Sequence, residues 1–282
     1  MMNLKEMNVR EYAEEIAKEL GGYDVKQIEK ANGIICTGIE IRTDNDVKPV
    51  VYVDAYYDHR MSVIDAISEI NKILKSNNTS EFNGVIDKIL DFNKIKDKLT
   101  LRLYNQKTKA DLFASAEYMG FDDLILVPYI QITDEASIKV TKELLGKWNI
   151  NEETLFAVAT YNLMKSSDFE IKSLVQVMAE MQGIPVDMVS ELETENPMYI
   201  VSNKIKSFGA VGILLPTIKA KLNVLFPDGY TVLPSSVHEV IVIGGGRNDP
   251  YFLEMVKQVN ATEVKPEEVL SDNVYYFEGG KK

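Results

Sequence analysis

Cysteine and histidine are scarce in this sequence. Cys36 is the single cysteine, and His59 and His238 are the only histidines among 282 residues. One thiol excludes an intramolecular disulfide and a cysteine-based zinc cluster within one chain, and two imidazoles exclude a three-histidine zinc site. We therefore expect a reducing compartment, the cytoplasm, and no zinc cofactor.

Long apolar runs and positive charge are scarce as well. No stretch approaches the roughly 18 to 20 apolar residues of a transmembrane helix. Residues 1–20 carry Lys and Glu between helically spaced apolar side chains, where a signal peptide needs an unbroken apolar centre. Lys and Arg number 31 against 43 Asp and Glu, which gives a net charge of −12. Because phosphate contacts need clustered basic residues, we expect neither nucleic acid nor membrane as a partner.

The remaining composition is that of a folded α+β protein. With 45% hydrophobic and 26% charged residues, the chain can bury a full-sized core. The patterning predicts an opening helix that ends at Gly21-Gly22, a meander of short antiparallel strands, and two further helices. The strands are expected at residues 23–29, 33–42 and 50–53, and the helices at residues 62–74 and 82–92.

The following residues continue with alternating and helical patterns. Strands are predicted at 99–104, 123–132 and 136–140, and the second of these is rich in β-formers and is placed in the middle of a sheet. Asn151 is expected to cap a helix. Residues 169–181 are predicted to form a Met-rich amphipathic helix whose apolar side chains lie in the core or face a partner, and the core is favoured. These side chains are Val175, Met178 and Met181.

A domain boundary is predicted at residues 183–197, where Gly183, Pro185, an acidic run and Pro197 interrupt regular structure. This divides the chain into an N-terminal region, residues 1–182, and a smaller α/β module, residues 198–282. The N-terminal region is expected to hold a mixed or antiparallel sheet with helices. In the module, strands are predicted at 198–202, 230–233 and 238–243, helices after Pro216 and from Asp249-Pro250 to Val259, and an edge strand at 274–277.

The polar segment that leads into the apolar stretch 240–243 is the richest in chemically active side chains. Ser235, Ser236, His238 and Glu239 include the groups that a hydrolase uses, with His238 as the base. The same residues suit a non-catalytic pocket, or a turn in which Pro234 fixes the backbone and a hydroxyl binds a nearby amide. A predicted strand directs His238 and Glu239 to opposite faces, and no Gly-x-Ser-x-Gly elbow surrounds either serine. The pattern therefore favours the structural turn.

Two other groups of residues carry weaker signals. The run Gly244-Gly245-Gly246-Arg247 follows a strand and precedes a helix, but a nucleotide-binding motif needs glycine or lysine spacings that are missing here. Asp54, Asp58 and His59 are cation ligands by type, but Arg60 adjoins them and no further ligand is identified. A connecting loop and a solvated loop are expected, and no cofactor is predicted.

Several stretches together resemble a known family. They are Pro197-Met198-Tyr199-Ile200-Val201-Ser202-Asn203-Lys204, Phe208-Gly209-Ala210, Leu233–Val240 and Glu268–Tyr276. With them, the chain resembles the bacterial domain-of-unknown-function family numbered 5688, whose members are typical of gut Firmicutes, including mobile elements. The C-terminal half is also similar to an uncharacterised YtpQ-like family. Neither resemblance implies an activity; both imply a reused α/β module in the C-terminal half.

The leading functional prediction is a non-enzymatic binding or regulatory protein, accessory to a mobile element, with another protein as its partner. Its candidate binding residues are Asn203, Lys204, Ser235 and His238. The alternative is a hydrolase that uses Ser235 or Ser236 with His238 and with Glu239 as the acid. The two predictions differ in what His238 contacts: a hydroxyl and an acid in an enzyme, backbone groups in a structural turn.

Overall fold

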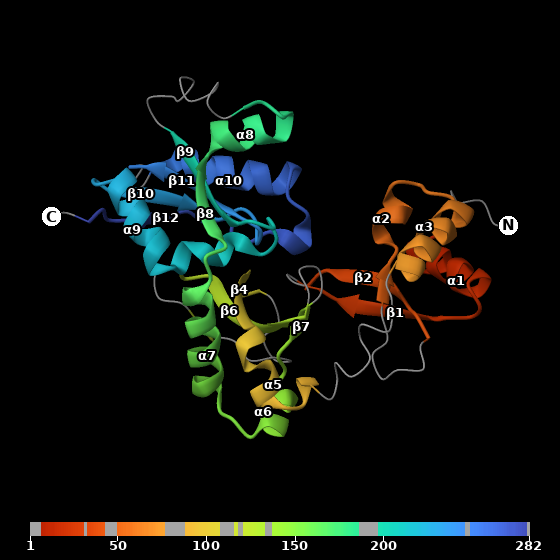
Figure 1. The fold of residues 1–282 in the computed structure, drawn as a ribbon. Coiled ribbons are helices and arrows are strands. Elements are labelled where there is room, and N and C mark those ends of the chain that lie inside the picture. Colours follow the sequence, from red (N-terminus) through yellow and green to blue (C-terminus); the bar gives the residue numbers. More distant parts are fainter. Residues whose placement is uncertain are drawn as a thin grey trace. The chain divides into compact units, whose positions relative to one another are not determined.

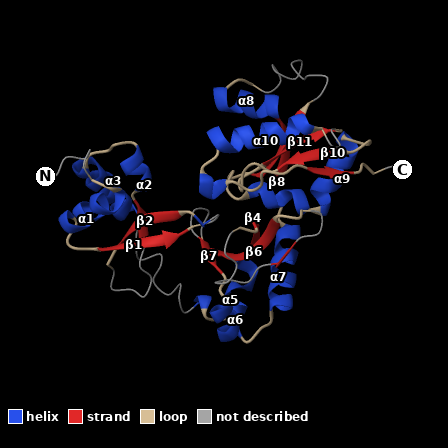
Figure 2. Cartoon of the chain, turned by 180° about the vertical axis from the view of Figure 1, so that it is seen from behind, coloured by secondary structure: helices blue, strands red, loops and turns tan. Residues whose placement is uncertain are grey.

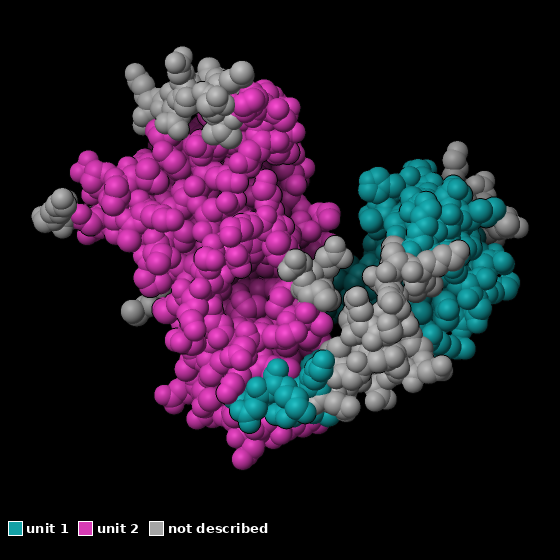
Figure 3. All heavy atoms as spheres, in the orientation of Figure 1, with its two compact units in different colours: residues 1–94 teal, residues 95–282 magenta. Residues whose placement is uncertain are grey.

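The computed structural model describes residues 7–30, 33–42, 50–76, 88–107, 116–117, 121–132, 137–185, 197–245 and 249–280. The chain divides into two compact units, residues 1–94 and residues 95–282 (Figure 3). Helices accompany small antiparallel sheets in the described parts of both units (Figure 1), which confirms the predicted α+β class.

The first unit is a meander of three strands covered by helices. Its sheet has the order β1-β2-β3, with antiparallel pairing throughout, as the sequence predicts. The strands are β1 (Asp24–Glu29), β2 (Ile35–Glu40) and β3 (Val50–Tyr52), and the helices are α1 (Val9–Glu19), α2 (Asp54–Asp58) and α3 (Val63–Ser76). A core forms between helices and sheet from Tyr12, Ala13, Ile16, Ala17, Ile39, Ile41, Val53, Ala66 and Ile70.

Helix α1 shows why its residues form a helix at this place. Asn8 closes a capping box with Glu11 at its start, and Gly21 and Gly22 follow its end at φ 111° and 79°, where a side chain would be strained. Tyr12 lies in the core, and its hydroxyl donates a hydrogen bond to Met61 O at 2.9 Å. Burial raises the pKa of Tyr12 to about 12, so the phenol remains a neutral donor at physiological pH.

The second unit contains two sheets. In the first, the central strand β6 (Leu124–Gln131) pairs with β4, β5 and β7, so the predicted central strand is confirmed. Helix α5 (Phe92–Ile95) spans the boundary between the two units. The other elements of this part are η3 (Lys96–Lys98), β4 (Leu99–Asn105), β5 (Ala116–Glu117), β7 (Ser137–Lys139), α6 (Lys142–Trp148) and α7 (Glu152–Lys165). Asn151 caps α7 as predicted, and Asn162 of that helix donates to Lys96 O and Leu99 O, which fixes α7 against the start of β4.

The second sheet is five-stranded and antiparallel, with the order β12-β10-β11-β9-β8. Its strands are β8 (Phe169–Ser173), β9 (Met198–Asn203), β10 (Tyr230–Leu233), β11 (Val240–Gly244) and β12 (Tyr275–Phe277). The other elements are α8 (Leu174–Gln182), the 3-10 helix η7 (Gly209–Leu214), α9 (Pro216–Leu225), α10 (Pro250–Thr262) and η8 (Pro266–Glu268). The strands lie between α10 and α9 (Figure 2). Alternate residues of each strand therefore face opposite helical layers. Leu233 and Ile243 pack against Val256 of α10.

One predicted helix is wrong in its first half. Residues 169–173 form β8, and α8 begins only at Leu174, with Ser173 and Gln176 in a capping box. The placement of its methionines in the core is also wrong, because Met178 is 51% exposed and Met181 is 78% exposed. The alternating residues of 169–173 find a partner in β9, and this pairing outweighs the local helical pattern.

The boundary between the two compact units lies between residues 94 and 95, whereas the sequence predicts a boundary at residues 183–197. Strand β8, before the predicted linker, pairs along its length with β9, after it. The sheet thus contains strands from both sides of that segment. The sequence did not show this, because the composition of a linker does not determine which strands pair across it. Residues 186–196 lie outside the described part of the chain, so the linker itself stays a prediction.

Most of another predicted helix, at residues 82–92, also lies outside the described residues, since 82–87 are not among them. Of the helices that are described, none is long and apolar enough to cross a membrane.

A carboxylate joins the C-terminal residues to the first sheet of the second unit. Asp123 immediately precedes β6 and accepts hydrogen bonds from Ser271 Oγ at 2.7 Å and Asn273 Nδ2 at 3.2 Å. The Tyr275 hydroxyl and, at 3.4 Å, Asn105 Nδ2 donate to it as well. Hydrogen bonds to a charged acceptor are among the stronger ones in proteins, so this cluster fixes residues 271–275 beside β6.

Candidate functional site

The polar segment Pro234–Glu239 is a turn that hydrogen bonds fasten on two sides. On one side, Ser235 O accepts from Leu270 N at 3.0 Å, and Val237 N donates to Glu268 O at 2.9 Å. On the other, His238 O accepts from Gly209 N and from Ser202 Oγ, both at 2.9 Å. Strand β11 begins only at Val240, so the prediction that His238 lies on a strand is wrong. Its carbonyl accepts from the backbone of η7 and from the Ser202 side chain of β9, and not from the backbone of a neighbouring strand.

Both nitrogens of the His238 ring face groups of the chain. Phe208 N donates to Nδ1 at 3.2 Å, so Nδ1 carries a lone pair and the neutral ring carries its proton on Nε2. Nε2 lies 3.7 Å from Glu268 Oε1. Glu268 is therefore the acid nearest to the ring, and the half-buried Glu239 side chain forms no hydrogen bond or ion pair with the described residues.

Neither Ser235 nor Ser236 forms a hydrogen bond with this ring. Ser236 Oγ accepts from the backbone N–H of His238 at 3.1 Å, which makes it a turn-closing hydroxyl. Ser235 is buried, and its carbonyl holds Leu270. A general base needs an unprotonated nitrogen within hydrogen-bond reach of the nucleophile. Here the unprotonated nitrogen already accepts a backbone N–H.

Behind the turn, an arginine lies between aromatic rings. The Arg102 guanidinium is 3.6 Å from the Phe208 ring centroid and 4.1 Å from that of Tyr129, and the Phe208 ring is 5.2 Å from His238. Arg102 is 7% exposed and donates to Ser137 Oγ at 2.8 Å. Burial raises the pKa of Tyr129, so its ring remains a neutral partner of the cation. The stack joins the first sheet to the turn.

The stretches that carry the family resemblance meet at this place. Ser202 belongs to the first, Phe208 and Gly209 to the second, His238 to the third and Glu268 to the fourth, and the hydrogen bonds and close approaches described above connect them. A Cβ on Gly209 would lie 2.5 Å from Asn203 N and 2.8 Å from His238 O, so this position has room only for glycine. The geometry thus gives these residues a structural role. We call the turn of residues 234–239, together with Ser202, Phe208, Gly209 and Glu268, the structural junction.

Asn203 and Lys204, the other candidate binding residues, line a separate cavity of about 560 Å³. The Asn203 amide is engaged by the backbone of Ser207, at 2.7 Å and 3.0 Å. Lys204 Nζ lies 3.5 Å from Asp168 Oδ1. Ser235 and His238 do not line this cavity, so the structure separates the four predicted binding residues into two pairs.

The weaker sequence signals also have local partners. Asp54, expected in a loop, opens the short helix α2, and its carboxylate accepts from Thr37 N at 2.9 Å and 3.1 Å. His59 Nδ1 lies 2.6 Å from Ala55 O, to which it donates. Across the described residues, no group of three or more His, Cys, Asp or Glu side chains is arranged to hold a metal ion. Residues 246–248 of the glycine-rich connection lie outside the described residues.

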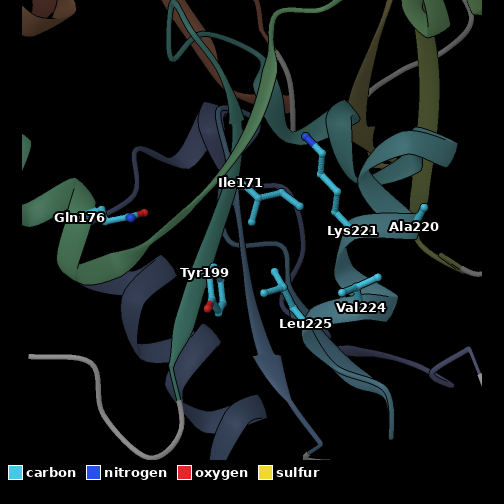
Figure 4. A pocket seen from close by; sticks show the side chains of 7 residues that line it. All are labelled: Ile171, Gln176, Tyr199, Ala220, Lys221, Val224 and Leu225. Atoms are coloured by element: carbon cyan, nitrogen blue, oxygen red, sulfur yellow. The ribbon is translucent and has the colours of Figure 1, made fainter. Parts of the chain in front are cut away.

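A mainly apolar pocket of about 610 Å³ lies between the edge strand β8 and helix α9 (Figure 4). Its volume is within the roughly 300–1,000 Å³ that ligand sites occupy. Leu225 points from α9 toward Tyr199 of β9, and Lys221 extends from α9 toward the side of β8 (Figure 4). The lining residues are Ile171, Gln176, Tyr199, Ala220, Lys221, Val224 and Leu225.

Among the described residues of this lining, Lys221 is the one with a charged side chain. Within the described part of the chain it forms no ion pair, and it is exposed. Val224 beside it is 81% exposed. The sequence interpretation missed this pocket, although Val224 departs from the helical spacing of the buried Ile218 and Leu222, which was a readable signal. Gln176 was readable too, as the end of the Ser173-x-x-Gln176 capping box.

Comparison with known proteins gives one match. The model of the family described as "Family of unknown function (DUF5688)" matches residues 5–279, which is nearly the whole chain. No match was found among the curated proteins, and none among the solved structures.

Proposed function

We propose that this protein, which belongs to the family of unknown function DUF5688, is a non-enzymatic binding protein that holds a protein partner in the pocket between β8 and α9. The pocket carries the proposal because it joins an apolar wall to a cation that has no ion-pair partner among the described residues. Exposed apolar surface with an adjacent charge is typical of partner-binding sites.

The exposed methionines support the same proposal. Met178 and Met181 lie on α8, which directly follows β8, and their exposure leaves flexible, polarisable side chains available to a partner. Together with Val224 and Leu225 of α9, they place large exposed apolar side chains on both helices that contact β8. A cytoplasmic location, a Firmicutes origin, a YtpQ-like C-terminal half and a role accessory to a mobile element remain predictions from the sequence.

Photo-crosslinking tests the proposal. A benzoylphenylalanine is placed at Val224 and, as a matched control, at Tyr251, which is 67% exposed on α10. We expect a protein to crosslink from the first position only. The purified partner should then bind the Ala220→Trp variant about tenfold more weakly, because the indole fills the pocket from an exposed position. The same crosslinks from both positions, or unchanged affinity, would contradict the proposal.

The hydrolase alternative retains a direct test. A serine-directed fluorophosphonate should not label the wild-type protein, since the acceptor nitrogen of His238 is held by Phe208 N. Mass spectrometry that finds the label on Ser235 or Ser236, lost in a folded His238→Ala variant, would make the enzyme the better proposal.

A further inference from the structure

Strand β8 is an edge strand with backbone groups that point away from the sheet. It pairs with β9 on one side, and the described residues provide no strand on the other. Lys204 N donates to Asp168 O at 2.9 Å, so residues 168 and 204 form a hydrogen-bonded pair just before the strand. Because such pairs alternate along an antiparallel ladder, the N–H and C=O groups of Phe169 and Ile171 point outward.

The same strand contributes a side chain to the pocket. Ile171 lines it, and Phe169, two residues earlier, faces the same layer, where its ring would meet a Cβ on Gly212 at 2.4 Å. A strand added beside β8 would place its own inward side chains about 5 Å from Ile171 on this face. The outward backbone groups of β8 and the apolar pocket are therefore close enough for a single extended ligand to bind both.

The charge at the pocket selects the chemistry of that ligand. Lys221 extends from α9 toward the side of β8 and lacks an ion-pair partner in the described chain (Figure 4). Lys172, the cation on β8 itself, is already paired, since its Nζ lies 3.0 Å from Glu170 Oε1 and 2.9 Å from Glu180 Oε1. Lys172 alternates with Ile171 and faces the opposite side of the strand. A carboxylate on the ligand complements Lys221.

We propose that the partner's binding segment is an extended peptide that adds to β8 as a further strand, with an aliphatic side chain in the β8–α9 pocket and a carboxylate beside Lys221. The proposal rests on the proposed function and specifies its ligand. A single acidic residue among apolar ones is expected, because the chain's net charge of −12 repels a polyacidic segment.

Synthetic peptides test this with the full-length chain. The probe is a fluorescent peptide of about eight residues that alternates valine and threonine around one glutamate, measured by anisotropy. Two versions carry N-methyl groups on alternate residues, in complementary registers. Only one register directs its N–H groups at β8, so one version should lose about tenfold or more in affinity while the other binds normally.

Charge variants test the role of Lys221. Lys221→Glu should weaken the glutamate peptide about tenfold and strengthen a lysine-substituted peptide. Lys257→Glu, which changes net charge equally from an exposed position on α10, should have little effect. Replacing the peptide's glutamate by glutamine should weaken binding to wild type about fivefold and strengthen binding to Lys221→Glu, because it removes a like-charge repulsion there.

Different results would contradict different parts of the proposal. Equal loss from both N-methylated versions, or from neither, would overturn strand addition, as would no binding of the glutamate peptide at about one millimolar. Equal effects of Lys221→Glu and Lys257→Glu would overturn the carboxylate contact. If sedimentation shows a dimer, and Ala220→Trp makes it dissociate, a second copy of the chain binds beside β8. That result would also contradict this proposal. In each case, crosslinking from Val224 decides separately whether a protein binds the pocket.

Discussion

The turn of residues 234–239 and the β8–α9 pocket differ in what their polar groups do. In the turn, the Ser236 hydroxyl, the His238 ring and the His238 carbonyl all have partners within the chain. At the pocket, Lys221 has no ion-pair partner among the described residues, and the outer backbone groups of β8 face away from the sheet. The residue types common in active sites therefore lie in the structural junction, whereas a lysine and several aliphatic residues form the surface that is open to a partner.

The largest expected effect concerns the junction. Gly209→Ala should lower the free energy of unfolding by about 3 kcal/mol, because its Cβ would collide with backbone atoms of Asn203 and His238. Urea denaturation measures this. Gly146→Ala in α6 is the matched control, since nothing lies within 4 Å of its Cβ, and it should stabilise the protein by about 0.5 kcal/mol. Equal effects at the two glycines would show that the junction is loosely packed.

Removing the histidine should have the next largest effect. His238→Ala should lower the free energy of unfolding by about 2 kcal/mol, because Phe208 N loses its acceptor in a partly buried site. Ser236→Ala should cost about 1 kcal/mol, since only one turn hydrogen bond is lost. Thermal and urea unfolding measure both. Unchanged stability in His238→Ala would contradict the structural role of this residue and favour the alternative in which His238 is a catalytic base.

A smaller effect is expected at the lysine that joins β8 to α8. Lys172→Ala should cost about 0.5 kcal/mol, the usual range for an ion pair that remains partly exposed to solvent. Hydrogen bonds with Glu180 and then Glu170 raise the pKa of Lys172 above its ordinary 10.5. The folded state thus favours the protonated amine, so this contribution is complete below pH 10.5 and is lost as the pH rises through the higher folded-state pKa. A wild-type to variant difference that grows with rising pH would contradict this.

The smallest effect on stability is expected in the pocket itself. Val224→Ser should change the free energy of unfolding by less than about 0.5 kcal/mol, because the side chain is 81% exposed. Leu222→Ala, two residues earlier on the same helix and fully buried, should cost about 3 kcal/mol. A substantial loss in Val224→Ser would mean that Val224 is covered within the chain, and the contrast between junction and pocket would disappear.

The sequence predicts those elements whose signals are local. Alternation and β-formers place β6, Asn151 places the start of α7, and Asp249-Pro250 places the start of α10. Each of these signals acts within a few residues, through side-chain caps or through the burial of one face. The α+β class follows from them.

Non-local pairing limits the rest of the prediction. Residues 169–173 form a strand because β9, which begins 25 residues after Ser173, pairs with them, and no window around 169–181 contains that information. The pocket depends on the same pairing, since Ile171 and Tyr199 reach one face only in that register. The residues of the turn were identified correctly as a group, but their partners at 202, 208–209 and 268–270 are set by tertiary structure.

The contacts of Asp123 have a consequence for the order in which the chain folds during synthesis. Ser271 and Tyr275, which donate to its carboxylate, follow it by 148 and 152 residues. At about 5 to 20 residues per second, a ribosome needs roughly 7 to 30 seconds to produce them. Throughout that interval the Asp123 end of β6 lacks those donors, whereas the core of the first unit is complete once α3 has emerged. The nascent second unit is thus the one that needs protection from premature association.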